Sequence, residues 1–500
     1  MSSDQPPAPQ STSGTDRTSG TESAAGPNSA IGHKSDTVRS GRIRRTVPIA
    51  GFAARSAGGR MVAGLRARTG DTAAIDRFHQ RTADRYAELL GHSKGVLMKA
   101  GQLLSTYDID PDSGATFSTY QQALQRLQAD APAMDFDTAR EVIEADLGRP
   151  ITELYERFSQ QPLAAASIGQ VHQAWLADGT PVAVKVQYPG VARAIRDDLA
   201  NTELLATFLK LGMSLTPKAM RTDQRAAAAE IAERIVEEID YRHEARNIAR
   251  FADLYRGHPF IRVPDVIDTH SSDRVLTMTF IEGISWAAAR TADEELRNQW
   301  AESISYFAFG SYRHANLFNA DPHPGNYRFG LDGTVGFVDF GCVKQFPERV
   351  RSGIVHMLRA AINADQDELY QLMLSTGFAP ADGDLSPAEA SAWWQLMAGP
   401  VVGPQPHRYT ADDATGLLQS MFGDNPASAA IRKMDVPSDY VMLSRINLGI
   451  NAILAELGAQ INVRAQSDDL DGVGAPITDH GARHVAWVRE RGLPFGLDPR

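Results

Sequence analysis

The sequence predicts an α+β protein in which a strand-rich segment precedes a mainly helical half. Alternating apolar residues over 163–190 predict a β-hairpin that turns at Asp178-Gly179. Strand character returns over 261–285, whereas apolar residues recur at helical spacing in most segments after Lys344. Strands gathered early and helices gathered late are typical of the α+β class.

The composition is that of a globular protein long enough for more than one domain. The chain has 500 residues, of which 43% are hydrophobic and 8% aromatic, which suits a large core. Its net charge of −11 argues against a nucleic-acid partner. The single cysteine, Cys342, excludes an internal disulfide framework and a cysteine-based zinc finger. The sequence has no run of 18 apolar residues and no signal-peptide core, so we expect a cytoplasmic protein without a transmembrane helix.

The N-terminal region changes character twice. Residues 1–32 are rich in Ser, Thr, Gly, Pro and Ala, so we expect a disordered tail, which we extend to residue 45. Residues 34–68 hold nine basic residues against one acid, Asp36. Such a segment either lies on an anionic membrane surface or is a solvated basic linker. Its glycines weaken a helix and favour the linker.

Helices are predicted over 72–104, 116–130 and 135–147. Asp135 and Asp137 supply caps for the third, and Gly148-Arg149-Pro150 ends it. The first contains Lys99-Ala100-Gly101-Gln102 among apolar residues. Burying this lysine and glutamine unpaired would be costly, and spacing alone favours their exposure to solvent.

The predicted hairpin carries two candidate phosphate-binding features. Lys185 ends the sequence Val182-Ala183-Val184-Lys185, which is close to the VAIK pattern of protein kinases. Gly169-Gln170-Val171 matches the end of a kinase glycine-rich loop, whose first two glycines would fall at Ala164 and Ala166. Alanine still lets backbone N–H groups approach phosphates, but it restricts the turn.

Residues 191–255 are predicted to be helical, and a strand over 274–283 runs toward a hinge whose backbone would bind adenine. A kinase-like site needs one helical acid to pair with Lys185, and the sequence alone does not choose it. The candidate acids are Glu230, Glu233, Glu237, Glu238, Asp240 and Glu244. Most acids of this kind are merely solvated.

The stretch from Asn319 to Lys344 follows a predicted helix over 291–317 and carries the main chemical signal. Asp321 precedes Asn326 by five residues, and Asp339-Phe340-Gly341 follows a short hairpin. This order matches the kinase catalytic loop and DFG motif, in which one carboxylate holds a nucleophile while an amide oxygen and a second carboxylate hold Mg²⁺. The alternative is a turn rich in Asp, Pro, Gly and Asn between two strands.

The remaining chain is predicted to be mainly helical. The expected helices are 347–363, 366–376, 387–398, 411–422 and 437–460. The last 40 residues are polar, so we expect a loosely ordered tail with a short helix near His484–Arg491.

Taken together, the motifs resemble those of the UbiB/AarF (ABC1-type) family of atypical, protein-kinase-like proteins. The resemblance covers roughly residues 85–350 in six ordered motifs. They are Lys99-Ala100-Gly101-Gln102, Ala164-Ala165-Ala166-Ser167, Lys185, Glu238-Ile239-Asp240, Asp321-Pro322-His323-Pro324-Gly325-Asn326 and Asp339-Phe340-Gly341.

The resemblance implies a two-lobed kinase-like fold with an N-terminal helical extension over the active site. The implied parts are a tail (1–45), the basic segment and extension (46–150), an N-lobe (151–285), a C-lobe (286–465) and a polar tail (466–500). It implies that ATP and Mg²⁺ are the cofactors and that Lys99 pairs with Glu238. The implied catalytic residues are Asp321, Lys185 and Lys99; those near the nucleotide are Ala164, Ala165, Ala166, Ser167, Lys185, Glu238, Gln102 and His323; the metal ligands are Asn326 and Asp339.

The resemblance also implies a function in isoprenoid-quinone or lipid metabolism, as an Mg²⁺-dependent ATPase or small-molecule or lipid kinase. The alternative is a pseudokinase-like scaffold switched by nucleotide, and phosphorylation of other proteins is disfavoured because the extension obstructs a peptide. Asn319 stands where kinases commonly carry a histidine, and no APE-like motif follows the DFG. His323 either contacts the γ-phosphate or packs the loop, and for Cys342 small-residue packing is favoured over redox chemistry. Any membrane or lipid contact would be peripheral, through 34–68.

Overall fold

The computed structural model describes residues 133–166, 168–199, 236–237, 239–380, 382–410, 413, 426–431, 433–435 and 437–498. All of them belong to one compact unit of the chain. The predictions for residues 1–130 lie outside the described residues, as do those for 200–235 and most of the predicted helix 411–422. Four candidate site residues also lie outside them: Lys99, Gln102, Ser167 and Glu238.

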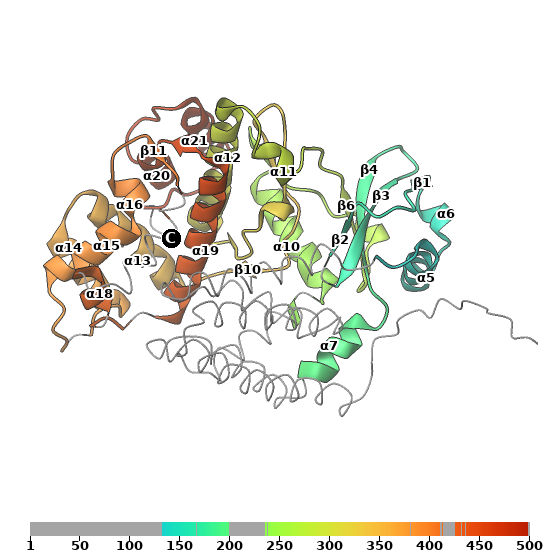
Figure 1. Cartoon of the computed structure of the whole chain (residues 1–500), viewed down its shortest axis with the longest axis horizontal. Coiled ribbons are helices and arrows are strands. Elements are labelled where there is room, and N and C mark those ends of the chain that lie inside the picture. The colour runs from blue at the N-terminus through green and yellow to red at the C-terminus, as the bar shows by residue number, and fades with distance from the viewer. Residues whose placement is uncertain are drawn as a thin grey trace, which may run out of the picture. The chain divides into compact units, whose positions relative to one another are not determined.

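The N-terminal part contains an antiparallel sheet in the order β1-β3-β4-β6, with β2 paired to β3 (Figure 1). Its strands are β1 (Arg157–Phe158), β2 (Ala164–Ala165), β3 (Gly169–Trp175), β4 (Pro181–Gln187) and β6 (Val275–Thr279). The predicted hairpin is confirmed as β3–β4, and Gly179 makes its turn with φ of 82°. A left-handed φ of this kind favours glycine.

The two faces of β4 have different partners because successive side chains of a strand point to opposite sides. Val182, Val184 and Val186 are fully buried in a small core that also contains Val142 and Ile143 of helix α5 (Phe136–Leu147). The helix begins as predicted, at a cap where the Asp135 side chain accepts a hydrogen bond from the backbone N–H of Thr138.

The opposite face of β4 is directed to helix α10 (Tyr241–Leu254). Gln187 donates from Nε2 to the backbone oxygen of Ile239 at 2.9 Å, just before this helix, and Lys185 contacts Glu244 on it. The other elements of this part are α6 (Ile151–Leu154), α7 (Val191–Leu199), β5 (Ile261–Arg262) and the 3₁₀ turn η2 (Asp268–His270). The alternation along one strand therefore separates a packing face from a polar face.

The C-terminal part is built around α12 (Glu294–Ala315), which is largely buried. The short strands near it are β7 (Phe318–Asn319), β8 (Tyr327–Phe329), β9 (Val335–Phe337), β10 (Val343–Lys344), β11 (His407–Arg408) and β12 (Gln460–Ile461). The remaining elements are α11 (Trp286–Ala289), the 3₁₀ turn η3 (Pro324–Asn326), α13 (Glu348–Ile362), α14 (Gln366–Thr376), α15 (Pro387–Met397), α16 (Gly399–Val402), α18 (Pro426–Ile431), α19 (Ser438–Leu457), α20 (Val463–Asp471) and α21 (Asp479–Glu490). A second, larger hydrophobic core joins these elements, so the α+β fold class is confirmed.

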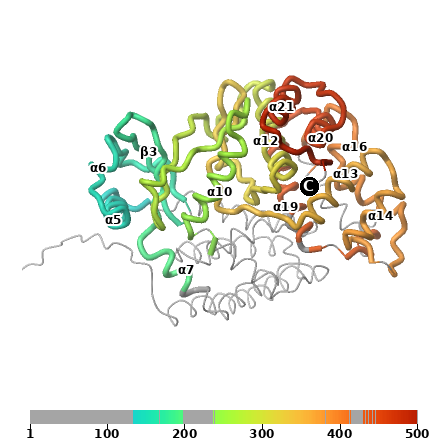
Figure 2. Tube along the Cα trace, turned by 180° about the vertical axis from the view of Figure 1, so that it is seen from behind, coloured from blue at the N-terminus to red at the C-terminus, as the bar shows by residue number. Residues whose placement is uncertain are grey.

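The prediction of a loosely ordered C-terminal tail was wrong for residues up to 498. Helices α20 and α21 pack against α12 (Figure 2). Leu470, Trp487 and Val488 are buried there. The polar composition was misleading because Asp471, at the end of α20, is buried in two ion pairs and Asp468 of the same helix is also paired.

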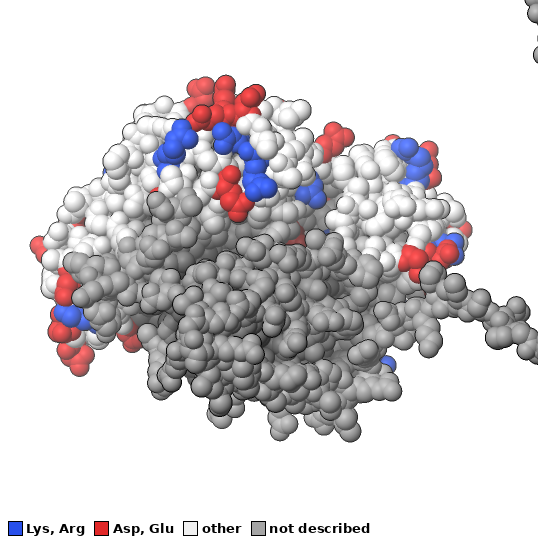
Figure 3. All heavy atoms as spheres, viewed as in Figure 1, with Lys and Arg blue, Asp and Glu red and all other residues white. Residues whose placement is uncertain are grey.

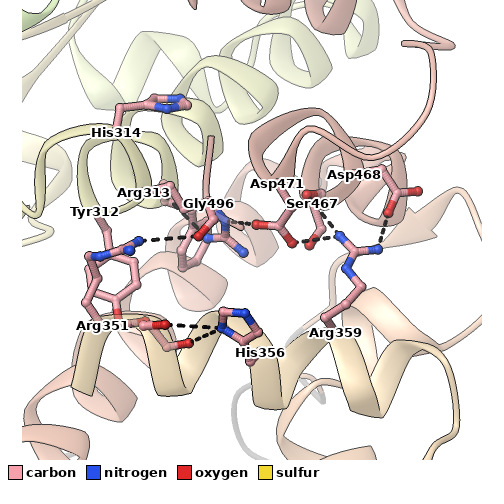
Figure 4. Close-up of polar contacts among 12 residues, drawn as sticks. Tyr312, Arg313, His314, Arg351, His356, Arg359, Ser467, Asp468, Asp471 and Gly496 are labelled. Atoms are coloured by element: carbon pink, nitrogen blue, oxygen red, sulfur yellow. Dashed lines mark hydrogen bonds and ion pairs between the residues drawn. The ribbon is translucent and has the colours of Figure 1, made fainter. Parts of the chain in front are cut away.

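These ion pairs form what we call the C-terminal cluster: Arg313, Arg359, Asp468 and Asp471 (Figure 4). Asp471 lies 2.6 Å from Arg313 Nε and 2.6 Å from Arg359 Nη2, and Asp468 lies 2.6 Å from Arg359 Nη1. The cluster joins α12 and α13 to the end of α20.

A histidine chain also holds the C-terminal segment: His258, His484 and His314, all buried. Nδ1 of His258 accepts from two backbone N–H groups, so its Nε2 donates to Nδ1 of His484 at 3.1 Å. Nε2 of His484 then donates to Nε2 of His314 at 3.0 Å, and Nδ1 of His314 donates to the Pro494 oxygen at 2.8 Å. This direction of donation requires three neutral rings.

No helix among the described residues is long and apolar enough to cross a membrane. On the face seen in Figure 3, the acidic and basic side chains of these residues lie next to one another.

Candidate functional site

Lys185 is the residue around which the candidate site is built. Its Nζ lies 2.6 Å from Glu244 Oε1 and 3.2 Å from Asp339 Oδ2. Lys185 is on β4, Glu244 on α10, and Asp339 follows β9 in the C-terminal part. We call these three residues the site cluster. Its contacts join both parts of the fold at one ammonium group.

Burial and charge act on these groups in opposite directions. Burial alone would lower the pKa of Lys185, but the Asp339 and Glu244 carboxylates raise it well above its ordinary value. Burial raises the pKa of Glu244 to about 7, since it outweighs the effect of the Lys185 ammonium. The lysine is therefore cationic at neutral pH, whereas Glu244 gains or loses its proton near neutral pH.

The alanine-rich segment forms a tight hairpin beside the strand that pairs with β4. Ala164 and Ala165 form β2, opposite Val171 and Gln170 of β3, and the backbone N–H of Ala166 donates to the Gly169 oxygen at 2.7 Å. Ala164, Ala165 and Ala166 are the described positions of the predicted loop, and all three therefore lie beside the start of β3. A side chain at Gly169 would collide with the backbone oxygen of Val186, so glycine is required there for the close approach of the strands.

Asp321 lies on an exposed loop directly after β7. Strand β7 pairs with β10, and the N–H of Ala320 donates to the Cys342 oxygen at 2.8 Å. Oδ1 of the Asn319 side chain accepts from the backbone N–H of Asp321 at 3.1 Å, and its Nδ2 donates to the backbone oxygen of Asp339 at 2.9 Å. The loop of Asp321 is thereby joined to the segment of Asp339.

Asn326 is joined to the same segment because its backbone oxygen accepts from the Val338 N–H at 3.0 Å. The side chain of Asp339 is 34% exposed. A carboxylate and an amide oxygen fit the hard oxygen ligands of Mg²⁺, which uses few protein groups when phosphates complete its coordination. Within the described residues, no group of three or more His, Cys, Asp and Glu could hold a metal.

The exposed His323 side chain is engaged within its own loop. Its Nδ1 accepts from the N–H of Gly325 at 3.1 Å, at the start of the turn η3. This contact orients the ring within the loop and does not decide between the two alternatives for His323. The structure thus joins Lys185 directly to Asp339, and joins Asn326 and Asp321 to the Asp339 segment through backbone contacts.

The sequence did not single out Glu244 as the partner of Lys185. Acids along a helix look alike in a sequence, but Glu244 shares its face with Asn247, Ile248 and Phe251, and all four are buried. Spacings of three, four and seven residues mark one helical stripe. An acidic residue within this otherwise largely apolar stripe was the sequence signal that could have identified Glu244 as the partner of Lys185.

Comparisons with known proteins identify the family to which the chain is similar. A family model described as the ABC1 atypical kinase-like domain matches residues 126–373. A solved structure of Rv3197 from Mycobacterium tuberculosis in complex with erythromycin has a TM-score of 0.56 and 30% identity, covering 81% of this chain and 97% of that one.

The chain belongs to the ABC1 atypical kinase-like family, also called the UbiB family. It has the kinase-like α+β fold of that family. It is 34% identical to Protein ACTIVITY OF BC1 COMPLEX KINASE 1, chloroplastic, of Arabidopsis thaliana, over 60% of this chain and 44% of that protein. It is 28% identical to Atypical kinase COQ8B, mitochondrial, of Rattus norvegicus, over 83% of this chain and 74% of that protein.

The chain spans about half the length of the first curated relatives it matches, with 44% of the Arabidopsis protein and 54% of a Synechocystis protein covered.

Proposed function

We propose that this ABC1-family chain binds ATP with Mg²⁺ and acts as an ATPase or as a kinase of small molecules or lipids. The contact of Lys185 with both Glu244 and Asp339 carries the proposal. Phosphoryl transfer requires a lysine held beside the phosphates and a carboxylate that holds the metal. An ammonium has three N–H donors, and with Glu244 and Asp339 as its two carboxylate partners, Lys185 retains one donor for a phosphate oxygen.

Each residue has a role that follows from its position. Asp339 and Asn326 would hold Mg²⁺, which when bound supplies positive charge beside the phosphates. The segment Ala164–Ala166 would lie next to the nucleotide, and Asp321, exposed on its loop, would orient the attacking hydroxyl or water. Lys99, Gln102, Ser167 and Glu238 remain proposed site residues on the strength of their motifs alone.

The proposed setting is isoprenoid-quinone or lipid metabolism. It is supported by the family and by relatives such as the kinase named COQ8B. In this proposal the protein is cytoplasmic, and the basic segment 34–68 makes peripheral contact with an anionic membrane or lipid surface.

The test is phosphate release from ATP and Mg²⁺ by the whole protein, with and without anionic liposomes and quinone-precursor mimics. We expect Asp339→Asn to abolish Mg²⁺-dependent release, because an amide offers the metal no charge. Asp332→Asn, at an exposed turn, serves as the matched control. Full activity of Asp339→Asn would remove the role given to Asp339, and the lack of any stimulation by lipid would remove the lipid setting.

One observation favours a second function, a scaffold that nucleotide switches without turnover. Both carboxylate oxygens of Asp339 already have protein partners. Oδ2 accepts from the Lys185 ammonium, and Oδ1 accepts from the N–H of Gly341 at 3.1 Å. A metal would have to compete with these contacts. A scaffold would gain thermal stability from ATP by mass action yet release no phosphate under any lipid condition.

A further inference from the structure

Two consecutive backbone carbonyls beside the candidate metal site are each held by a side-chain amide. Asn319 Nδ2 donates to the oxygen of Asp339 at 2.9 Å, and Asn247 Nδ2 donates to the oxygen of Phe340 at 3.0 Å. The two amides come from different elements, β7 and α10. A carboxylate can move only as far as its backbone allows, so these bonds bear directly on where the Asp339 carboxylate lies.

Asn247 belongs to the same stripe of α10 as Glu244. The helix contacts Lys185 through Glu244 and the Phe340 oxygen through Asn247. One turn further on, the ring of Phe251 packs against the ring of Phe340 with centroids 4.8 Å apart. A displacement of α10 would therefore move the lysine contact and the Asp339–Phe340 backbone together.

Asn247 is only 4% exposed, so its amide donates in a dry environment. A buried donor or acceptor that loses its partner is costly, which makes this bond a firm constraint on the Phe340 oxygen. Asn319 adds a second constraint from the catalytic-loop side, because its Oδ1 also accepts from the N–H of Asp321. The Asn319 amide is thus hydrogen-bonded to the backbone of both Asp321 and Asp339.

We infer that Asn247 and Asn319 are positioning residues that set the Asp339 carboxylate for a divalent cation. Asn247 couples that carboxylate to the Lys185–Glu244 contact, and Asn319 couples it to Asp321. This inference rests on the proposed function, since it assigns a role within the same nucleotide site. Neither residue touches the nucleotide or the cation in this scheme.

The experiment is an Mg²⁺ titration of ATP turnover and of ATP-induced thermal stabilisation, using the whole protein. Asn247→Leu removes the buried donor and keeps the number of side-chain heavy atoms, and Asn319→Ala removes the half-buried one. Loss of an outer partner of a metal ligand typically weakens metal binding about 10–100-fold. We expect the half-saturating Mg²⁺ concentration to rise about tenfold or more in both variants, while stabilisation by ATP in EDTA changes less than about twofold.

Gln395→Leu is the matched control. Gln395 Nε2 donates to the oxygen of Ala361 at 3.2 Å, so the variant loses the same kind of bond between α15 and α13. We expect it to change the melting temperature only. Wild-type Mg²⁺ dependence in both asparagine variants would overturn the inference alone. A wild-type protein that ATP does not stabilise, with or without Mg²⁺, would overturn the proposed function and the inference with it.

Discussion

The site cluster and the C-terminal cluster have opposite charge arrangements. The site cluster places one cation, Lys185, between two carboxylates. The C-terminal cluster places one carboxylate, Asp471, between two guanidinium groups, and Asp468 adds a second carboxylate (Figure 4). With all groups ionised, the C-terminal cluster is therefore balanced, whereas the site cluster has one negative charge in excess.

The two clusters also differ in how deeply one carboxylate is buried. The Asp471 side chain, which two guanidinium groups share, is 0% exposed, whereas that of Asp339 is 34% exposed. Asp468, in the C-terminal cluster, is 32% exposed, but the charges of that cluster cancel. The net negative charge of the site cluster can attract a cation from solution. Burial or exposure of a carboxylate thus does not by itself mark a functional site; the charge imbalance does.

The largest effect on stability is expected for Asp471→Asn. The substitution leaves two buried guanidinium groups without their shared carboxylate, and breaking a buried pair typically costs about 3–5 kcal/mol. The free energy of unfolding, measured by chemical denaturation, should fall by about that amount. Asp339→Asn should change it by about 1 kcal/mol or less, because its carboxylate is partly solvated and competes with Glu244 for one lysine. Equal losses would contradict the contrast between the clusters.

A smaller effect on stability, but a clear one on turnover, is expected for Glu244→Gln. Glutamine mimics the protonated acid and weakens the hold on Lys185, so phosphate release should fall about tenfold or more, equivalent to roughly 1.4 kcal/mol. Because burial raises the pKa of Glu244 to about 7, wild-type turnover should also fall as the pH drops below about 7.

The pH profile separates this role from a general loss of structure. Glu244→Gln should lose the part of the decline that lies near pH 7, since glutamine does not titrate. Asp253→Asn, at an exposed position of the same helix, should keep the wild-type profile. Identical profiles for wild type and Glu244→Gln would refute the titration assigned to Glu244.

The histidine chain should make stability depend on pH. Burial holds the pKa of His258 and of His484 well below the ordinary value of 6.5. The unfolded chain therefore binds more protons, and the stabilisation, present above pH 6.5, is lost as the pH falls. Burial also raises the pKa of Glu302 to about 7. The contribution of Glu302 to the free energy of unfolding has the opposite pH dependence, because it is lost as the pH rises through about 7.

A substitution within the chain isolates this dependence. His484→Gln keeps a donor and an acceptor but cannot take up a proton. Its free energy of unfolding should be lower than that of the wild type at pH 7.5 and should fall less steeply between pH 7 and 5. Denaturation curves across this range measure both slopes, and equal slopes would show that the histidines do not control the response.

The sequence alone predicted those features that depend on the spacing of nearby residues. It predicted the β3–β4 hairpin, the fold class and the family, and it placed Lys185 and Asp339 in motifs that the fold brings into contact. It could not choose Glu244, because that choice depends on which face of α10 meets β4. It also misjudged α20, where Asp471 counts as polar in composition but is paired with two arginines that are 46 residues apart in the chain.

The smallest effect is expected at an exposed pair of nearly the same length. Arg408 Nη2 lies 2.7 Å from Glu294 Oε1, close to the 2.6 Å contacts of Asp471, but both side chains are 51% exposed. Solvent screening limits such pairs to about 1 kcal/mol or less. Glu294→Gln should therefore change the free energy of unfolding by no more than that, and high salt should remove the difference. A loss as large as that of Asp471→Asn would show that distance, rather than burial and charge balance, sets the strength of these clusters.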